Sequence, residues 1–275
     1  MMTTGLLRPY LAVLKLRFQL GMQYRTAALA GMATQLFFGF IFIMVYEAFY
    51  THAAPDVVPP MSLQQICAYI WLQQAFLSLI TLWFRDNELF QLIATGNIAY
   101  ELCRPAGVYG FWYSKLLAQR IASALLRCIP VLLVAMLLLP EPYRMAPPTG
   151  VNGLLFVVAM LLGLLLVVSI SMLVYTSVFV TLSPMGSLLL FSMIGDFLAG
   201  MMIPVPLMPD WLQTLTAWLP FRYTVDFPFR VYSGHIPSNE ALQGMVIQLV
   251  WLLALVGFGR FVLGKALRRV VVQGG

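Results

Sequence analysis

The feature that most constrains this chain is the alternation of long stretches that contain no charged residue with short segments that hold nearly all of the charge. Only 9% of its 275 residues are charged and 61% are hydrophobic, whereas about a quarter of a soluble domain is charged. A helix of about 20 apolar residues crosses a hydrocarbon core of about 30 Å. The sequence therefore predicts an all-α, polytopic membrane protein that forms a single domain over residues 1–275.

Six stretches have the length and composition of transmembrane helices. We expect the crossings at residues 26–49, 64–84, 116–139, 151–181, 186–203 and 242–263. The fourth stretch is longer than a straight crossing requires, so it is expected to tilt or to extend beyond the membrane.

The basic residues predict the orientation of these crossings, because Lys and Arg close to a span are retained on the cytoplasmic side. Of the sixteen Lys and Arg residues, eleven fall on the side of the two termini, three fall on the other side, and Arg127 and Arg260 lie within spans. Both termini are therefore expected in the cytoplasm, with the chain spanning the plasma membrane. The formal net charge of +6 then reflects topology rather than nucleic-acid binding, which would need a basic face with interleaved aromatic residues.

The segment 1–24 precedes the first crossing and carries apolar residues at helical spacing, flanked by basic residues. This pattern is typical of a helix that lies in the membrane interface. A basic tail that only sets the topology would also explain the charges.

The cytoplasmic segment 85–115 opens with an amphipathic helix. Leu89, Leu92 and Ile93 fall on one stripe of this helix. The polar residues outside the stripe include Asp86, Glu88 and Gln91. A stripe of this size cannot form a core alone, so it is expected to be buried either against the ends of this protein's own spans or against a partner.

The external segment 204–239 begins with prolines that end the fifth crossing. A short helix follows, with Trp211 and Trp218 on its apolar stripe and Pro220 at its end. Because Trp side chains prefer the level of the lipid headgroups, this helix is expected to lie on the outer interface or to re-enter it rather than to cross the membrane.

No catalytic or nucleotide-binding pattern is found in the sequence. The nearest match to a P-loop, from Gly259 to Ala266, closes an apolar span and lacks the Ser or Thr that binds magnesium. The two histidines and three cysteines have no spacing typical of metal ligands. We therefore expect no catalytic residue, no metal and no cofactor in this chain.

Two ionisable residues fall inside predicted crossings, Asp196 in the fifth and Arg127 in the third. A charge at the centre of a bilayer costs several kcal/mol, about 3 on insertion scales, so such residues face protein or water. One interpretation is that Asp196 and Arg127 pair as a structural lock. A proton-carrying or substrate-binding role for Asp196 is the alternative.

Taken together, these elements resemble the membrane subunits of type 2 ATP-binding-cassette exporters, in the branch of small six-span bacterial permeases. The likeness covers nearly the whole chain and rests on the order and placement of several motifs. They are the N-terminal interfacial helix, the 86–96 helix that runs into Glu101-Leu102-Cys103-Arg104-Pro105, Gly195-Asp196-Phe197, Leu219-Pro220-Phe221-Arg222, Asp226-Phe227-Pro228-Phe229-Arg230 and Tyr232-Ser233-Gly234.

The resemblance implies that the cytoplasmic helix is a coupling helix that docks in a cleft of a separate ATPase dimer, which binds ATP and Mg²⁺. Leu89, Leu92 and Ile93 would be the apolar anchors, with Asp86, Glu88 and Gln91 making polar contacts. It also implies a second permease, identical or similar, in contact with membrane lipid. The external helices would cap the translocation path, with the gate residues Trp211, Trp218, Phe221, Arg222 and Asp226.

The function expected from this reading is export of a hydrophobic, amphipathic or peptide-like compound, driven by ATP hydrolysis in the partner. A secondary carrier is one alternative, and it predicts inverted repeats, broken spans and several ionisable residues at mid-membrane. A structural subunit of a membrane complex is another, although it would not need an amphipathic helix in its cytoplasmic loop.

Overall fold

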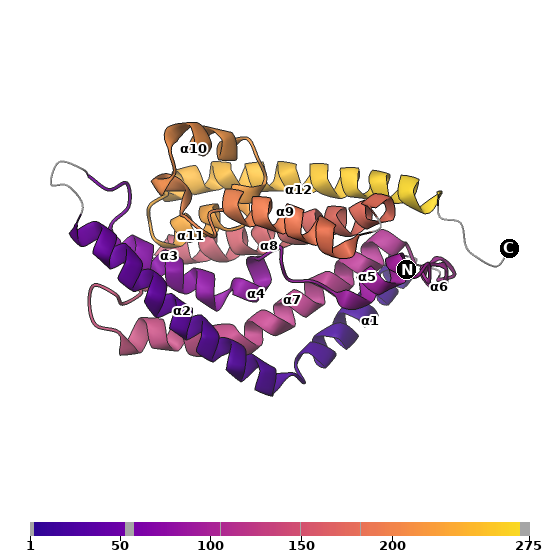
Figure 1. Cartoon of the computed structure of the whole chain (residues 1–275), viewed down its shortest axis with the longest axis horizontal. Helices are drawn as coiled ribbons and strands as arrows, with labels where there is room; N and C mark the ends of the chain where they lie inside the picture. The colour runs from indigo at the N-terminus through magenta and orange to yellow at the C-terminus, as the bar shows by residue number, and fades with distance from the viewer. Residues whose placement is uncertain (1–2, 53–57, 105, 149, 182, 270–275) are drawn as a thin grey trace.

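The structure, a computed structural model, describes residues 3–52, 58–104, 106–148, 150–181 and 183–269, and every regular element in these residues is a helix (Figure 1). The four longest apolar elements are α2 (Arg25–Thr51), α7 (Val108–Leu133) with the π-helical turn η1 (Val134–Leu138), α8 (Gly150–Thr181) and α12 (Ser238–Leu267). Each is long and apolar enough to cross a membrane. They correspond to the first, third, fourth and sixth predicted crossings.

The remaining elements are shorter and connect or cover the long helices. They are α1 (Thr3–Gly21), α3 (Leu63–Ala75), α4 (Leu77–Ile80), α5 (Asn87–Ala94), α6 (Ala99–Leu102), α9 (Pro184–Leu198), η2 (Val205–Leu207), α10 (Asp210–Ala217), η3 (Phe221–Tyr223) and α11 (Asp226–Tyr232). The predicted interfacial, cytoplasmic and external helices are therefore present as α1, α5 and α10.

The second and fifth predicted crossings differ from continuous helices. The stretch 64–84 breaks at Phe76, resumes as α4 and leaves helical geometry after Ile80. The stretch 186–203 ends at Leu198, where Gly200 adopts a positive φ of 85° and the Met201 N–H donates to the Asp196 carbonyl at 3.0 Å. This arrangement is a Schellman-type helix end, for which glycine is the favoured residue. The helices alone therefore establish four long spans rather than six.

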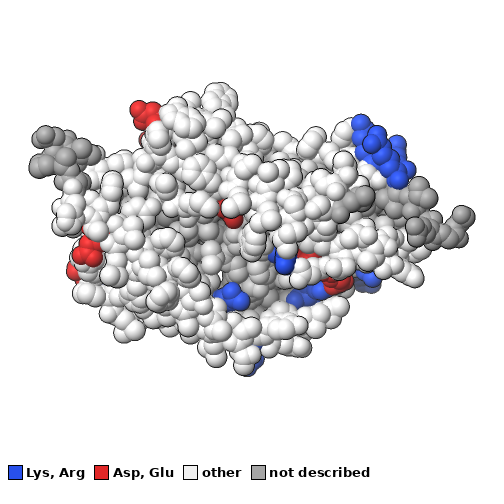
Figure 2. All heavy atoms as spheres, viewed as in Figure 1, with Lys and Arg blue, Asp and Glu red and all other residues white. Residues whose placement is uncertain are grey.

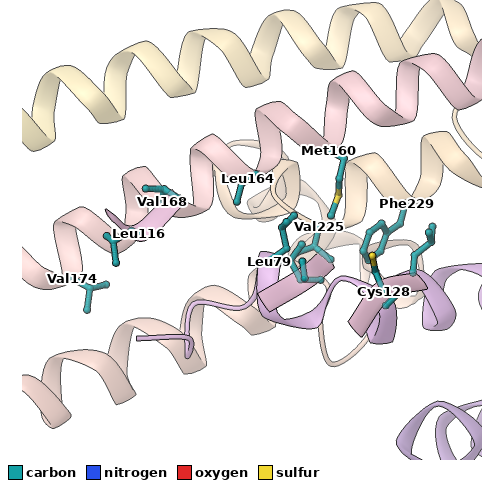
Figure 3. Close-up of a cluster of buried hydrophobic side chains, with 14 of the residues drawn as sticks. Leu79, Leu116, Cys128, Met160, Leu164, Val168, Val174, Val225 and Phe229 are labelled. Carbon is teal, nitrogen blue, oxygen red and sulfur yellow. The ribbon is translucent and has the colours of Figure 1, made fainter. Parts of the chain in front are cut away.

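The core lies around α3 and α8, and α8 is the most enclosed of the four long helices. Every side chain from residue 66 to residue 75 is buried, and α8 packs against α12, α11, α9 and α7. Figure 3 shows part of this core, where Leu79, Cys128 and Met160 lie near Val225 and Phe229 of the α11 region. The helices of the predicted external segment thus pack into the same core as the long helices.

The outer faces of α2 and α9 expose large apolar side chains, including Phe37, Phe38, Met44, Leu190 and Met193. Figure 2 shows that the face carrying α2 and α9 is mostly uncharged and is hollowed between these two helices, with a few Lys or Arg and Asp or Glu atoms visible in and around the hollow. An exposed apolar surface of this kind is covered by lipid or by another apolar subunit.

Figure 1 also shows the two ends of the molecule. The described N-terminal residues, α5, α6 and the end of α12 lie at one end of the long axis, and α11 and the loop between α7 and α8 lie toward the other. The cytoplasmic and external segments expected from the basic residues are therefore separated along this axis.

Candidate functional site

The short helix α5 is held at its start by Asp86. The Asp86 carboxylate accepts hydrogen bonds from the N–H groups of Glu88 at 2.8 Å and Leu89 at 3.3 Å, which is N-cap geometry. The Asp86 N–H in turn donates to the Tyr175 hydroxyl of α8 at 2.6 Å. Asp86 is buried, so it fixes α5 to the end of α8 instead of presenting a polar contact to a partner.

The apolar stripe of α5 packs against this protein's own spans. Leu89 and Ile93 are buried and belong to the main core, and Leu92 is half-buried against it. Phe90 lies over the Tyr175 ring, with the ring centroids 4.5 Å apart. The sequence leaves two possible burial sites for this stripe, the spans of this chain or a partner. In the structure the stripe is buried against the spans of this chain. Leu89 and Ile93 are therefore not available as anchors for a partner.

Glu88 connects α5 to two further helices. Its carboxylate forms an ion pair with Arg17 of α1 and another with Lys115 of α7 at 2.9 Å. Burial raises the pKa of Glu88, but the hydrogen bonds from Arg17 and Lys115 outweigh this effect, so its pKa lies below the ordinary value of 4.5. Glu88 therefore stays ionised near neutral pH and links α1, α5 and α7.

The outward face of α5 is polar and exposed. Asn87, Gln91 and Thr95 are exposed along it, and the neighbouring α6 exposes Tyr100. This surface lies at the end of the molecule that carries the described N-terminal residues (Figure 1). Of the six residues expected to contact an ATPase, Gln91 is the one that is exposed without an ion pair or a buried role.

A second polar group of residues lies deeper, around the fully buried Arg120 of α7. Its guanidinium donates to the carbonyls of Leu79 at 3.2 Å, Thr81 at 2.7 Å and Phe84 at 3.2 Å, and to the Ser171 hydroxyl of α8 at 3.0 Å. Three of these acceptors lie at the end of α4 and in the non-helical segment after it. Arg120 therefore satisfies the carbonyls that the break in the second predicted span leaves without helical partners.

Asp196 of α9 completes the same arrangement from the other side. Its two carboxylate oxygens accept from the Thr81 hydroxyl and from the Leu82 N–H, both at 3.0 Å. The neighbouring Gly195 permits this approach, because a Cβ there would lie 2.4 Å from a methyl group of Leu82. Arg120 and Asp196 together hold residues 81–84, which we call the unwound segment.

The predicted pairing of Asp196 with Arg127 is wrong in this structure. Asp196 bonds to the unwound segment, and Arg127 instead lies against Gly31 of α2. The physical reason is the position of Arg120, which lies on the same face of α7 seven residues earlier, about 10 Å along the helix. The seven-residue spacing of Arg120 and Arg127 places both side chains on one face of α7, which is the sequence signal for a second buried cation.

The predicted external gate residues do not form one cluster. Asp226 is fully buried, where it accepts from the Val205 N–H at 3.1 Å and pairs with Arg230 at 3.2 Å. Trp211 and Trp218 are exposed on α10, as expected for side chains at the headgroup level.

The other two gate residues face elements of this chain. Phe221 lies beside Gly195 of α9, where a Cβ would come within 3.1 Å of its ring. The Arg222 guanidinium lies 5.6 Å from the centre of the Tyr223 ring. The external segment is therefore a packed cap whose inner face is structural and whose outer face is aromatic.

The described residues contain no group of three or more His, Cys, Asp or Glu side chains that could hold a metal ion. The arrangement seen in them is mechanical: a short surface helix fixed to three other helices, and a broken span held by one cation and one anion.

A family model described as ABC-2 family transporter protein matches residues 29–274 of this chain. No curated protein and no solved structure matches it.

Proposed function

The chain belongs to the ABC-2 transporter family, whose permeases are membrane transport components without an ATPase site of their own, and from this premise we propose that it is the permease subunit of an exporter. A separate ATP-binding-cassette ATPase dimer would bind ATP and Mg²⁺ and drive transport. The compound exported would be hydrophobic, amphipathic or peptide-like, and the membrane would be the plasma membrane.

The observation that carries this proposal is the attachment of α5. Its inner face is fixed to α8 through Tyr175, and Glu88 is paired with both Arg17 of α1 and Lys115 of α7. Its outer face, with Gln91 and Thr95, is exposed at the end of the molecule. A displacement imposed on that face by an ATPase would be transmitted to three helices at once, because interlocked side chains move as a unit.

A second permease would cover the hollowed apolar face between α2 and α9. The unwound segment of the second predicted crossing and helix α9 of the fifth lie near this face. For the topology, we propose six crossings with both termini in the cytoplasm. Two hollowed faces placed opposite each other would enclose a path between the subunits.

A secondary carrier is the second candidate, and one observation favours it. The unwound segment between α4 and α5 is a broken span of the kind that carriers use to bind substrates. However, both terminal nitrogens of Arg120 and both carboxylate oxygens of Asp196 bond to groups of this chain. These side chains are engaged in holding the backbone, so the proposal of an ATP-driven permease is preferred.

The test is copurification of the ATPase with three permease variants. Gln91→Arg places a bulky charge on the exposed face of α5, and we expect it to reduce ATPase retention about tenfold while the permease stays folded. Thr214→Arg is the matched control, because Thr214 is equally exposed on α10 at another part of the molecule. It should retain the ATPase fully.

Leu89→Asp is expected to act differently, because Leu89 is buried in this chain. A buried charge without a partner costs several kcal/mol, about 3 or more, so this variant should lose thermal stability together with ATPase retention. If Gln91→Arg retained the ATPase as well as Thr214→Arg does, α5 would not be the docking element.

A further inference from the structure

Arg127 is a cation of the third predicted span that has no ion-pair partner among the residues that the structure describes. Among the described residues its side chain makes no ion pair, and its Nε is buried without a hydrogen-bond acceptor. Asp196, the acid expected to neutralise it, is bonded to the unwound segment instead. A guanidinium has five N–H donors and no acceptor, so these donors require an acceptor from elsewhere.

The position of the guanidinium is built into the packing of α7 against α2. A Cβ on Gly31 would lie 2.8 Å from the Arg127 Cζ and 2.9 Å from its Nη1. The planar group therefore lies directly on the backbone of α2, in a space that exists because residue 31 is glycine. Arg127 is held in place without being neutralised.

The guanidinium lines a cavity of about 410 Å³ between α1, α2 and α7. The polar side chains that line it are Arg17, Tyr24, Gln119, Ser123 and Arg127. None of the described residues that line this cavity is acidic. Among the described residues, the side chains of Gln119 and Ser123 make no hydrogen bond. The Gln119 amide and the Ser123 hydroxyl are therefore available as donors in the cavity that the Arg127 guanidinium lines.

The cavity lies at the elbow where α1 ends at Gly21 and α2 begins at Arg25. Gly31 is six residues into α2, which is about 9 Å along the helix axis. The headgroup layer on each side of a bilayer is about 5 to 7 Å thick, and α1 has the sequence of an interfacial helix. The cavity is therefore within reach of the phosphate level of the leaflet that contacts α1.

We propose that this cavity binds the headgroup of an anionic phospholipid, with Arg127 as the anchor for the phosphate. A guanidinium fork matches the geometry of phosphate oxygens and binds them with charge-assisted hydrogen bonds. Gln119 and Ser123 would supply further donors, and Leu20, which is exposed and lines the same cavity, would contact the acyl chains. An ionisable group in the membrane is thereby neutralised by the membrane itself.

The bound lipid would also lie beside the anchor of α5. Arg17 lines the cavity and pairs with Glu88, so the lipid and the coupling helix share one residue. The binding itself does not depend on the proposed export function, and it is measured without an ATPase.

The experiment is native mass spectrometry of the full chain in detergent with added phosphatidylglycerol, and with phosphatidylcholine as the zwitterionic comparison. We expect the wild type to retain phosphatidylglycerol preferentially and Arg127→Gln to reduce this retention about tenfold. Arg127→Lys keeps the charge without the fork and should lie between the two. Arg25→Gln is the matched control, because Arg25 is exposed at the same elbow but does not line the cavity.

Gly31→Ala tests the same site without removing the charge. It favours helix, but its Cβ displaces the guanidinium, so phosphatidylglycerol retention should fall while the melting temperature of the protein stays close to that of the wild type. Addition of inorganic phosphate should not displace the lipid, since a free phosphate lacks the acyl chains. Equal retention by wild type and Arg127→Gln, equal loss in Arg25→Gln, or equal retention of both lipids by the wild type would overturn the proposal.

Discussion

At the residue scale, Arg120 and Asp196 show how a broken helix is accommodated inside a membrane protein. Lipid offers no hydrogen bonds, so backbone groups that leave a helix need partners from the protein. Arg120 donates to the carbonyls of Leu79, Thr81 and Phe84, and Asp196 accepts from the Leu82 N–H. Both charged side chains are thus explained by the backbone between α4 and α5.

Arg120→Met is predicted to be the most damaging single change in this group. It removes four donated hydrogen bonds and leaves buried acceptors without partners, which should lower the free energy of unfolding by about 3 kcal/mol. Asp196→Asn should cost about 1 kcal/mol, because the amide oxygen still accepts from the Leu82 N–H. Unfolding of the purified protein in detergent, followed by circular dichroism, measures both values. Arg127→Met is the control, and an equal loss in Arg127→Met and Arg120→Met would contradict this role of Arg120.

The sequence predicts that Asp196 needs a polar partner, but not which one. Its partners are the Thr81 hydroxyl and the Leu82 N–H, which lie where a predicted span stops being helical. The stretch 64–84 contains no charged residue, no glycine and no proline, so the usual helix-breaking residues do not mark the break. It arises from tertiary contacts, chiefly those of Arg120, which the sequence places only by its spacing from Arg127.

At the element scale, α5 is a helix whose position the sequence predicts and whose packing partner it does not predict. The periodicity of Leu89, Leu92 and Ile93 and the cap at Asp86 define the helix. The burial of its stripe depends on the Tyr175 hydroxyl and ring at the end of α8, about 90 residues later. No sequence pattern within residues 85–115 indicates this contact with Tyr175. Only the structure therefore distinguishes burial against the spans of this chain from burial against a partner.

The ion pairs of Glu88 make a prediction about pH. Because Arg17 and Lys115 lower the pKa of Glu88 in the folded state, these pairs stabilise the protein fully above the pKa of an unfolded Glu, about 4.3. The stabilisation is lost as the pH falls through the lower, folded-state pKa. The melting temperature of Glu88→Gln should therefore lie below that of the wild type by a constant amount between pH 7 and about pH 5. The gap should close at lower pH, and a gap that widened on acidification would contradict these ion pairs.

At the scale of the whole molecule, hydropathy predicts the positions of the long helices. It does not predict that the second and fifth predicted crossings are interrupted or short. α2, α7, α8 and α12 are long apolar helices at the expected positions. The stretches 64–84 and 186–203 end early because their ends are held by side chains from other helices and by a left-handed glycine at residue 200. The external segment likewise packs into the core through Phe229 and Asp226, which composition alone does not reveal.

The same scale shows how the elements act together in the proposed function. The polar face of α5 lies at one end of the molecule and the external helices lie toward the other (Figure 1). Between them, α7 and α8 connect α5 to the unwound segment through Lys115, Arg120 and Ser171. A movement of α5 would therefore reach the broken span, which faces the hollow between α2 and α9.

The most direct test of this account is site-specific photo-crosslinking of the full-length protein in its own membrane. A benzoylphenylalanine is placed at Gln91, on the exposed face of α5, or at Asn239, an equally exposed residue at the start of α12, and the adducts are identified by mass spectrometry. The account predicts that position 91 crosslinks to a protein with an intact P-loop and that position 239 does not. A P-loop protein captured at position 239, or none captured at position 91, would contradict it.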